Sequence, residues 1–246
     1  MKPTISPVGD CAISIDFGQV IDPKINRHIR QTIERIQELH LEGIIELVPT
    51  YCALLLQYDA MLYSYSDICN LMEPLLEPSA TDDANERVTV IEIPTVYGGE
   101  FGPDLGFVAS HNNLSEDEVV SIHSGTDYLV YMLGFIPGFT YLGGMDPRIA
   151  TPRLSSPRTL IPAGSVGIAG AQTGTYPSDS PGGWQIIGRT PVTMYDMSKE
   201  QAALLSAGDY VRYVPIDEAE YNRIKALGSD YVPSMYEVEV GELRGY

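Results

Sequence analysis

The chain has 246 residues, of which 44% are hydrophobic, enough to bury a core in one large domain or two small ones. Its formal net charge of -18 disfavours nucleic acid and anionic membranes as partners, and no apolar run reaches the ~18 residues that a membrane span needs. The three cysteines lie far apart and no signal peptide is recognisable, so we expect a soluble, cytoplasmic protein without a disulfide framework.

The first 76 residues predict a small α+β layer. Alternating polar and apolar residues indicate strands, whereas apolar residues three or four positions apart indicate helices. Asp22 and Pro23 supply a capping side chain and a first-turn proline, which are typical of a helix start. The order strand, strand, helix, strand, strand, helix places both helices on one face of an antiparallel sheet. Of these six elements, five have predicted positions: a strand within 8–17, a helix from Pro23 to Leu39, strands over 44–48 and 51–57, and a helix that begins at Ser66-Asp67.

Residues 77–87, with the sequence EPSATDDANER, are polar and lack periodicity, which predicts a linker. We therefore expect one domain over residues 1–86 and a second over 87–246. In the second, Ser115 and Glu118 have capping-box spacing and predict a short helix that ends near His123. Short apolar runs between glycines and prolines predict a β-barrel or sandwich there. These runs are 88–93, 128–135, 160–161, 166–169, 185–187, 192–195 and 210–214, and a terminal helix is predicted over 219–227.

The segment from His123 to Pro191 differs from the rest of the chain. It holds 12 of the 23 glycines and 8 of the 18 prolines, and its four arginines outnumber its three aspartates. A locally basic segment whose cations are all arginines suits an anionic small molecule or an acidic partner surface. It contains no lysine, no metal-ligand spacing, no serine-nucleophile elbow and no Walker A loop. We therefore expect no metal site, and phosphates would have to meet arginines, backbone N–H groups or another chain.

Three features of this segment could carry chemistry. His123 sits at a predicted helix end, where the helix dipole favours the charged imidazolium, and histidine moves protons readily at neutral pH. Gln172 lies between glycines and can present a donor and an acceptor to a cyclic or linear amide. Gly182 and Gly183 could offer backbone N–H groups to an oxyanion, although the pair could equally form a plain turn.

Several motifs occur in a fixed order, and together they resemble the family of the 5-oxoprolinase B subunit (PxpB), also called the KipI or allophanate hydrolase subunit 1 family. The resemblance covers nearly the whole chain. It implies a ferredoxin-like α+β domain followed by a cyclophilin-like β-barrel that carries the site. It also implies a KipA-like partner (PxpC), which would share a composite site with this chain, and a third oxoprolinase subunit (PxpA). The motifs are GGEFGPDL (98–105), YMLGFIPGFTYLGGMDPR (131–148), TPR (151–153), PR (157–158), IPAGSVGIAGAQTGTYP (161–177) and SPGGWQIIGRTP (180–191).

The resemblance further implies a subunit of an ATP-dependent enzyme that opens the lactam 5-oxoproline to glutamate, with ATP shared among subunits and the isolated chain inactive. We then expect His123 to transfer a proton, Arg158 to hold a carboxylate or phosphate, and Gln172 to bind the lactam amide. Two alternatives stay open: a KipI-like inhibitor of a sporulation histidine kinase, and a subunit of a urea carboxylase or allophanate-hydrolase-like enzyme. The candidate substrate-binding residues are Phe135, Pro137, Gly138, Tyr176, Gly182, Gly183 and Trp184.

Overall fold

The computed structural model describes residues 2–77 and 87–245, and the chain divides into two compact units, 1–82 and 83–246. The predicted boundary after residue 86, and most of the predicted linker over 77–87, lie outside the described residues. The α+β fold class is confirmed, since the first unit is a small sheet with two helices and the second is a barrel. In the described part of the chain, no helix is both long and apolar enough to cross a membrane.

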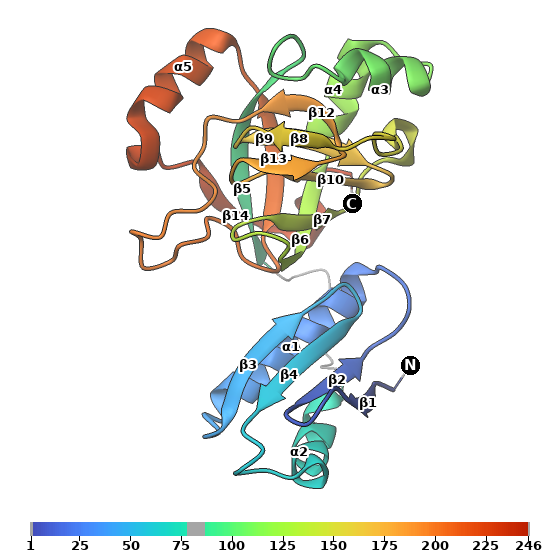
Figure 1. Ribbon diagram of the computed structural model, residues 1–246, viewed down its shortest axis with the longest axis vertical. Helices are drawn as coiled ribbons and strands as arrows, with labels where there is room; N and C mark the ends of the chain where they lie inside the picture. The colour runs from blue at the N-terminus through green and yellow to red at the C-terminus, as the bar shows by residue number, and fades with distance from the viewer. Residues whose placement is uncertain (1, 78–86, 246) are drawn as a thin grey trace. The chain divides into compact units, whose positions relative to one another are not determined.

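The first unit contains a four-stranded antiparallel sheet in the order β1-β2-β4-β3 (Figure 1). Strands β2 and β3 both run antiparallel to β4, so they are parallel to each other, and α1 connects them. This split βαβ arrangement, with a fourth strand at the edge, confirms the expected ferredoxin-like layer. The elements are β1 (Thr4–Pro7), β2 (Ala12–Asp16), α1 (Pro23–Glu38), β3 (Ile44–Pro49), β4 (Ala53–Tyr58) and α2 (Tyr65–Met72), followed by the 3₁₀ turn η1 (Glu73–Leu76).

Local sequence explains both helices of this unit. The Asp22 carboxylate caps α1 by accepting from the backbone N–H of Lys24, and Pro23 occupies the first turn, as predicted. The second helix begins two residues earlier than expected. Ser64, not Ser66, is its cap, because the Ser64 hydroxyl accepts from the backbone N–H of Asp67 and the Asp67 carboxylate accepts from that of Ser64.

The second unit is built on an eight-stranded sheet in which seven strands follow the order β10-β9-β12-β5-β13-β6-β7 and β14 pairs with β5. The end strands β10 and β7 pack beside each other, so the sheet is nearly closed, which confirms the predicted barrel. Figure 1 shows α5 on one side of this barrel and α3 with α4 on another. The strands are β5 (Arg87–Tyr97), β6 (Asp127–Leu133), β7 (Thr140–Gly143), β8 (Arg158–Ile161), β9 (Ser165–Ala169), β10 (Gln172–Thr175), β11 (Ser180–Gly182), β12 (Gln185–Arg189), β13 (Tyr210–Pro215) and β14 (Met235–Glu239).

The described residues of this unit also form the helices α3 (Leu105–His111), α4 (Glu116–Ser124) and α5 (Glu218–Leu227). The predicted capping box of Ser115 and Glu118 begins α4. Helix α3 was not predicted, and the strand predicted over 192–195 is absent. There, the backbone N–H of Val192 donates to the Thr190 hydroxyl, which forms a turn, and the segment makes only an isolated bridge between Tyr195 and Ala203. The remaining 3₁₀ turns are η3 (Pro147–Ile149), η4 (Gly228–Asp230) and η5 (Val240–Glu242).

Candidate functional site

A small cavity in the barrel unit brings together five of the seven predicted substrate-binding residues. Its volume is about 170 Å³, which corresponds to roughly five or six water molecules and suits a small metabolite. The loop before β7, strand β11 and the residues on either side of β11 supply its walls. We call it the aromatic cavity; its lining residues are Phe135, Phe139, Tyr141, Arg153, Tyr176, Pro181, Gly182, Gly183 and Trp184.

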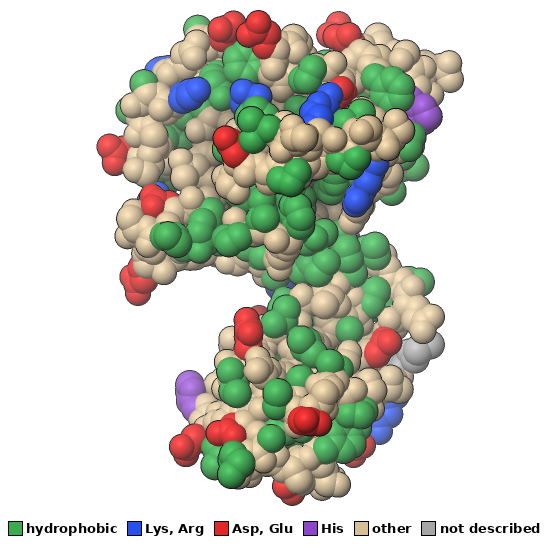
Figure 2. Space-filling view, viewed as in Figure 1, with side chains coloured by type: hydrophobic (Ala, Val, Ile, Leu, Met, Phe, Trp, Pro, Cys, Tyr) green, Lys and Arg blue, Asp and Glu red, His purple; other side chains and the backbone are tan. Residues whose placement is uncertain are grey.

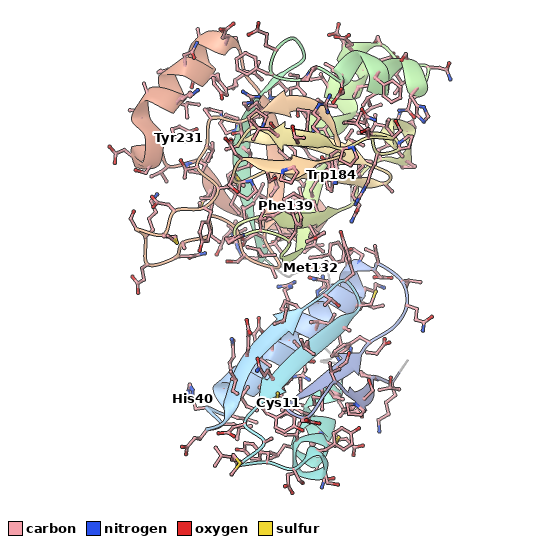
Figure 3. All side chains as sticks on the ribbon, viewed as in Figure 1. Cys11, His40, Met132, Phe139, Trp184 and Tyr231 are labelled. Carbon is pink, nitrogen blue, oxygen red and sulfur yellow. The ribbon has the colours of Figure 1, made fainter. Side chains whose placement is uncertain are left out.

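Phe139 is the centre of the aromatic walls. Its ring packs edge-to-face against Trp184 and Tyr176, with centroid distances of 5.6 Å in both cases, a geometry that the aromatic quadrupole favours. Figure 3 labels Phe139 and Trp184, which both belong to the barrel unit. Both rings are buried, so the walls of the cavity are already packed against one another before any ligand arrives.

Phe135 contributes the most exposed wall. It has a φ of 65°, a left-handed conformation that is rare for a bulky residue, and 64% of its surface is exposed. Its ring still contacts that of Phe139, with centroids 5.6 Å apart. Neither the strained backbone nor the exposed ring of Phe135 is needed for protein stability. Residues in such rare backbone conformations cluster at functional sites.

Gly182 allows the backbone to approach the aromatic walls. A Cβ atom at this position would lie 2.5 Å from the Tyr176 hydroxyl oxygen and 2.7 Å from Cδ1 of Ile161, closer than packed atoms allow. At the neighbouring Gly183 the nearest atom would be 3.7 Å away, an ordinary contact. The first glycine is therefore required by close packing at the cavity wall, whereas the second is not.

Arg153 supplies the cation of the aromatic cavity. Its guanidinium carbon lies 6.0 Å from the centre of the Trp184 ring, within reach of a cation–π interaction, and the residue is exposed. The sequence interpretation did not select it, although it ends the TPR motif that carried part of the resemblance. Burial raises the pKa of Tyr176 to about 12, although Arg153 and Arg158 act to lower it. The Tyr176 hydroxyl is therefore protonated at neutral pH and can donate a hydrogen bond.

Arg158 is paired with a carboxylate of its own chain, and its expected role toward a substrate carboxylate or phosphate stays a prediction. Its guanidinium donates to both carboxylate oxygens of Asp104, at 2.9 and 2.7 Å. The same carboxylate accepts from the backbone N–H of Ile186 at 2.6 Å. Arg158 therefore joins β8 to the start of β12 through a two-pronged ion pair, and its charge is already matched. Arg153 lines the aromatic cavity, whereas Arg158 does not.

His123 lies inside the barrel and is not charged, in contrast to the imidazolium that a helix end favours, while its expected catalytic role stays a prediction. Its side chain is fully buried, and burial lowers its pKa to about 3. Desolvation of the ring outweighs the favourable helix end that the sequence suggested. At neutral pH the imidazole is therefore neutral, and it is shielded from solvent.

Both ring nitrogens of His123 are already hydrogen-bonded. Nδ1 lies 2.8 Å from the Tyr97 hydroxyl and Nε2 lies 2.7 Å from Oγ1 of Thr173. If the Thr173 hydroxyl donates to the Gly167 carbonyl oxygen, 3.1 Å away, Nε2 of His123 is the donor to Oγ1. In that tautomer Nδ1 accepts from the Tyr97 hydroxyl, and burial raises the pKa of Tyr97, so this hydroxyl carries its proton.

Gln172 and His123 lie on opposite faces of strand β10. Successive side chains of a strand point to opposite sides, and Thr173 points inward to His123. Gln172 and Gly174 therefore share the other face. A Cβ atom on Gly174 would contact the Trp184 and Phe139 rings, at 3.3 and 3.5 Å. Gln172 thus lies on the face of β10 that carries the aromatic cluster, although it does not line the cavity itself.

Pro137 and Gly138 belong to the loop that carries Phe135 but lie outside the cavity lining. Pro137 is exposed. Gly138 is buried with a φ of 81°, and a Cβ atom there would lie 2.7 Å from Cβ of Tyr195. The role of Gly138 is therefore to let the loop pack closely against Tyr195. Among the described residues, no group of three histidine, cysteine, aspartate or glutamate side chains is placed to hold a metal ion.

Comparison with known proteins identifies the family of this chain. Residues 3–205 match the family model of the carboxyltransferase domain, subdomain C and D. The B subunit of 5-oxoprolinase from Bacillus subtilis is 44% identical over 234 residues, which cover 90% of this chain and 96% of that protein. The B subunit of 5-oxoprolinase from Escherichia coli O157:H7 is 55% identical over 128 residues, or 52% of this chain and 59% of that protein.

The solved structure of the urea carboxylase of Kluyveromyces lactis matches with a TM-score of 0.78 at 21% identity, and covers 96% of this chain and 24% of that one. At this identity the likeness establishes the fold alone. The family model and the B. subtilis relative each span most of the chain. The chain therefore belongs to the carboxyltransferase-domain family, and within it to the branch of the 5-oxoprolinase B subunits, as its motifs predicted.

Proposed function

We propose that this chain is the B subunit of an ATP-dependent 5-oxoprolinase, a complex that opens the lactam 5-oxoproline to glutamate. The observation that carries the proposal is the aromatic cavity of about 170 Å³, with Arg153 and the Tyr176 hydroxyl in its walls. 5-Oxoproline is a small, nearly flat ring with one carboxylate and one amide, so it requires flat apolar walls, a cation and a hydrogen-bond donor. Relatives named as the B subunit of 5-oxoprolinase, at 44 and 55% identity, support the same activity.

Each polar group of the substrate has a candidate partner in the proposed complex. Arg153 pairs with the carboxylate, a charge-assisted contact that arginine makes well. The Tyr176 hydroxyl, kept protonated by burial, donates to the lactam carbonyl oxygen. Gln172 remains a candidate for the lactam amide from the adjoining face of β10, and the N–H groups of Gly182 and Gly183 remain candidates for an oxyanion.

His123 acts, in this proposal, as a positioning residue rather than as a proton carrier. It is neutral, buried and bonded at both nitrogens, so it has no free position from which to exchange a proton with a substrate. Its bond to Thr173 holds β10, the strand that bears Gln172 and also Gly174 beneath the aromatic rings. Arg158 similarly acts through Asp104 to hold the start of β12, next to Trp184.

The aromatic cavity binds substrate but needs other chains for the reaction. Its lining includes no carboxylate, histidine, cysteine or serine, so it lacks an obvious nucleophile or general base. We propose that the KipA-like partner completes the site, that ATP supplies the phosphoryl group that makes the amide oxygen a leaving group, and that the third oxoprolinase subunit finishes hydrolysis. The isolated chain is then inactive.

The test is a turnover assay with purified partner subunits, in which glutamate formation from 5-oxoproline is measured with and without ATP. We expect activity only with all subunits and ATP, and Arg153→Gln should raise KM about ten-fold, because a charge-assisted contact is worth ~1.5 kcal/mol or more. Arg148→Gln is the matched control, since Arg148 pairs with Asp146 outside the cavity. A fully assembled complex that left 5-oxoproline intact would refute the substrate. Wild-type kinetics of Arg153→Gln would refute the cavity as its site.

The kinase-inhibitor alternative depends on an apolar docking rim around Phe135, Phe139 and Trp184. Phe139 and Trp184 are buried, with 2 and 6% of their surface exposed, and only Phe135 is open to solvent. These three residues therefore form the walls of a cavity and not a flat apolar face, which favours a small ligand over a helical partner. The urea-carboxylase alternative is supported by fold likeness at 21% identity, which says nothing about substrate, and by a urea amidolyase that is 27% identical, well below the 44 and 55% of the 5-oxoprolinase B subunits.

A further inference from the structure

A second cavity, of about 410 Å³, opens between helix α5 and the barrel, and it shares no lining residue with the aromatic cavity. Two cations from distant parts of the chain meet in it, Arg189 at the end of β12 and Lys225 on α5. The sequence shows no lysine between residues 123 and 191, so it is the packing of α5 that brings one to this segment. We call this the α5 cavity; its other lining residues are Pro162, Ala163, Gly164, Pro177, Asp179, Thr190, Pro191, Val192, Thr193 and Tyr221.

The charge of Arg189 is not neutralised within the described residues. Its Nε is buried and has no hydrogen-bond partner there, and no carboxylate in residues 2–77 or 87–245 forms an ion pair with its guanidinium. Its contact with a polar side chain is to the Tyr221 hydroxyl. By contrast, Arg158 and Arg212 of the same unit are each held by a carboxylate. Partial burial of an arginine without a counter-charge destabilises a fold, and a bound anion would remove this penalty.

Tyr221 lies between the two cations. Nζ of Lys225 is 5.7 Å from the centre of its buried ring, and its hydroxyl is hydrogen-bonded to Arg189. Burial raises the pKa of Tyr221, so the hydroxyl keeps its proton. Lys225 is exposed and, like Arg189, has no carboxylate partner among the residues that the structure describes. The cavity therefore presents two unpaired positive charges around one aromatic ring.

One carboxylate, that of Asp179, also lines the α5 cavity. Its Oδ1 accepts from the backbone N–H of Ala163 at 2.8 Å, which offsets part of its charge, and the cavity keeps a surplus of one positive charge from its side chains. A surplus cation is notable in a chain with a net charge of -18. Figure 2 shows basic side chains spread across the visible face of this unit, while most acidic ones lie toward its margins.

We propose that the α5 cavity is a phosphate-binding site, in which Arg189 and Lys225 hold a phosphate group. Arginine offers paired N–H donors to two phosphate oxygens and lysine supplies a compact point charge, a combination that suits a dianion. The volume accommodates inorganic phosphate or the phosphates of a nucleotide. The site does not depend on the identity of the lactam substrate, because the two cavities share no lining residue.

The test is calorimetric titration of the full chain with inorganic phosphate and, separately, with ATP. We expect saturable binding of at least one of them, and about ten-fold weaker affinity in Lys225→Gln and in Arg189→Gln. Asp179→Asn should bind more tightly, because it removes the repelling carboxylate. Binding of phosphate alone would identify the free ion as the ligand, and binding of ATP alone would identify a nucleotide phosphate chain; either supports the site.

Two control variants make the result specific. Arg223 lies on the same helix, pairs with Glu220 and does not line the α5 cavity. The variant Arg223→Gln should therefore bind phosphate as the wild type does. Arg153→Gln removes the cation of the aromatic cavity and should also leave phosphate binding intact. Saturation by neither ligand, or equal loss of affinity in Arg223→Gln, would overturn the proposal, as would loss in Arg153→Gln without loss in Lys225→Gln. Lys225 is exposed, so its variant keeps the test valid if Arg189→Gln fails to fold.

Discussion

The guanidinium of Arg158 donates two hydrogen bonds of 2.7 and 2.9 Å to the carboxylate of Asp104, and the same carboxylate accepts a third, of 2.6 Å, from the backbone N–H of Ile186. One ion pair therefore joins the start of α3, strand β8 and strand β12. Asp104 is nearly buried, with 12% of its side chain exposed, whereas one third of Arg158 is exposed. The ion pair is next to Trp184, since the Trp184 carbonyl oxygen is 3.4 Å from the Arg158 guanidinium.

Arg158→Gln should lower the free energy of unfolding by about 2–3 kcal/mol, because it leaves the Asp104 carboxylate buried without its counter-charge. That value lies between the cost of losing an exposed pair and that of a fully buried one. Urea denaturation provides the measurement. Arg148→Gln, in which the lost partner is a largely exposed arginine, should cost at most ~1 kcal/mol. Equal losses in the two variants would show that the Arg158 pair is no more than a surface contact.

Gly182→Ala should destabilise the chain by about 1–3 kcal/mol, the usual range for overpacking. The added methyl group would lie 2.5 Å from the Tyr176 hydroxyl oxygen and 2.7 Å from Cδ1 of Ile161, so the packing of this cavity wall must shift. We expect both a lower melting temperature and a higher KM for 5-oxoproline in the assembled complex. Gly183→Ala, whose new methyl group has only ordinary contacts at 3.7 Å, is the matched control and should change neither property. The reverse ranking would contradict the described packing.

Phe135→Asn should separate stability from ligand binding. Asparagine tolerates a positive φ far better than phenylalanine, so relief of strain offsets the lost ring contact, and we expect stability within about 1 kcal/mol of wild type. Loss of the wall beside Phe139 should nevertheless raise KM several-fold. Leu160→Asn, at an exposed apolar residue outside the cavity, should leave KM unchanged. A large drop in stability with normal KM would mean that Phe135 serves the fold rather than the ligand.

Much of the fold was predictable because its signals are local. The Asp22–Pro23 helix start and the Ser115–Glu118 capping box depend on neighbouring residues, and both are confirmed. The chemistry of the site was less predictable because it depends on long-range burial. His123 carries a helix-end signal in the sequence, but its neutral state follows from the barrel that closes around it, which contributes Thr173 from 50 residues away.

The two arginines near the aromatic cavity illustrate the same limit. Both Arg153 and Arg158 follow a proline in the basic segment, and nothing local distinguishes them. Asp104, 54 residues before Arg158, forms an ion pair with Arg158, whereas Arg153 lies in the cavity wall. The ordered motifs could therefore locate the region, whereas which of the two arginines lines the cavity depends on the tertiary fold.

His123 gives the chain a specific dependence of stability on pH. Its folded pKa is about 3, below the ordinary value of 6.5, so between these values the unfolded chain binds a proton that the folded chain does not. Lowering the pH from about 6.5 toward 3 therefore favours unfolding, by up to ~1.4 kcal/mol for each pH unit from this residue. Above pH 6.5 its contribution to stability is fully present.

His123→Gln should remove this dependence while keeping the hydrogen bonds, because the glutamine amide can donate to Thr173 and accept from Tyr97. Urea denaturation at several values between pH 7 and pH 4 should show that the wild type loses stability more steeply than the variant, by about one proton in slope. In the wild type, the imidazole resonance of His123 should not titrate in this range. In the assembled complex the variant should keep most of its turnover if His123 only positions β10. A loss of a hundred-fold or more, in a variant that still folds, would restore His123 as a proton carrier.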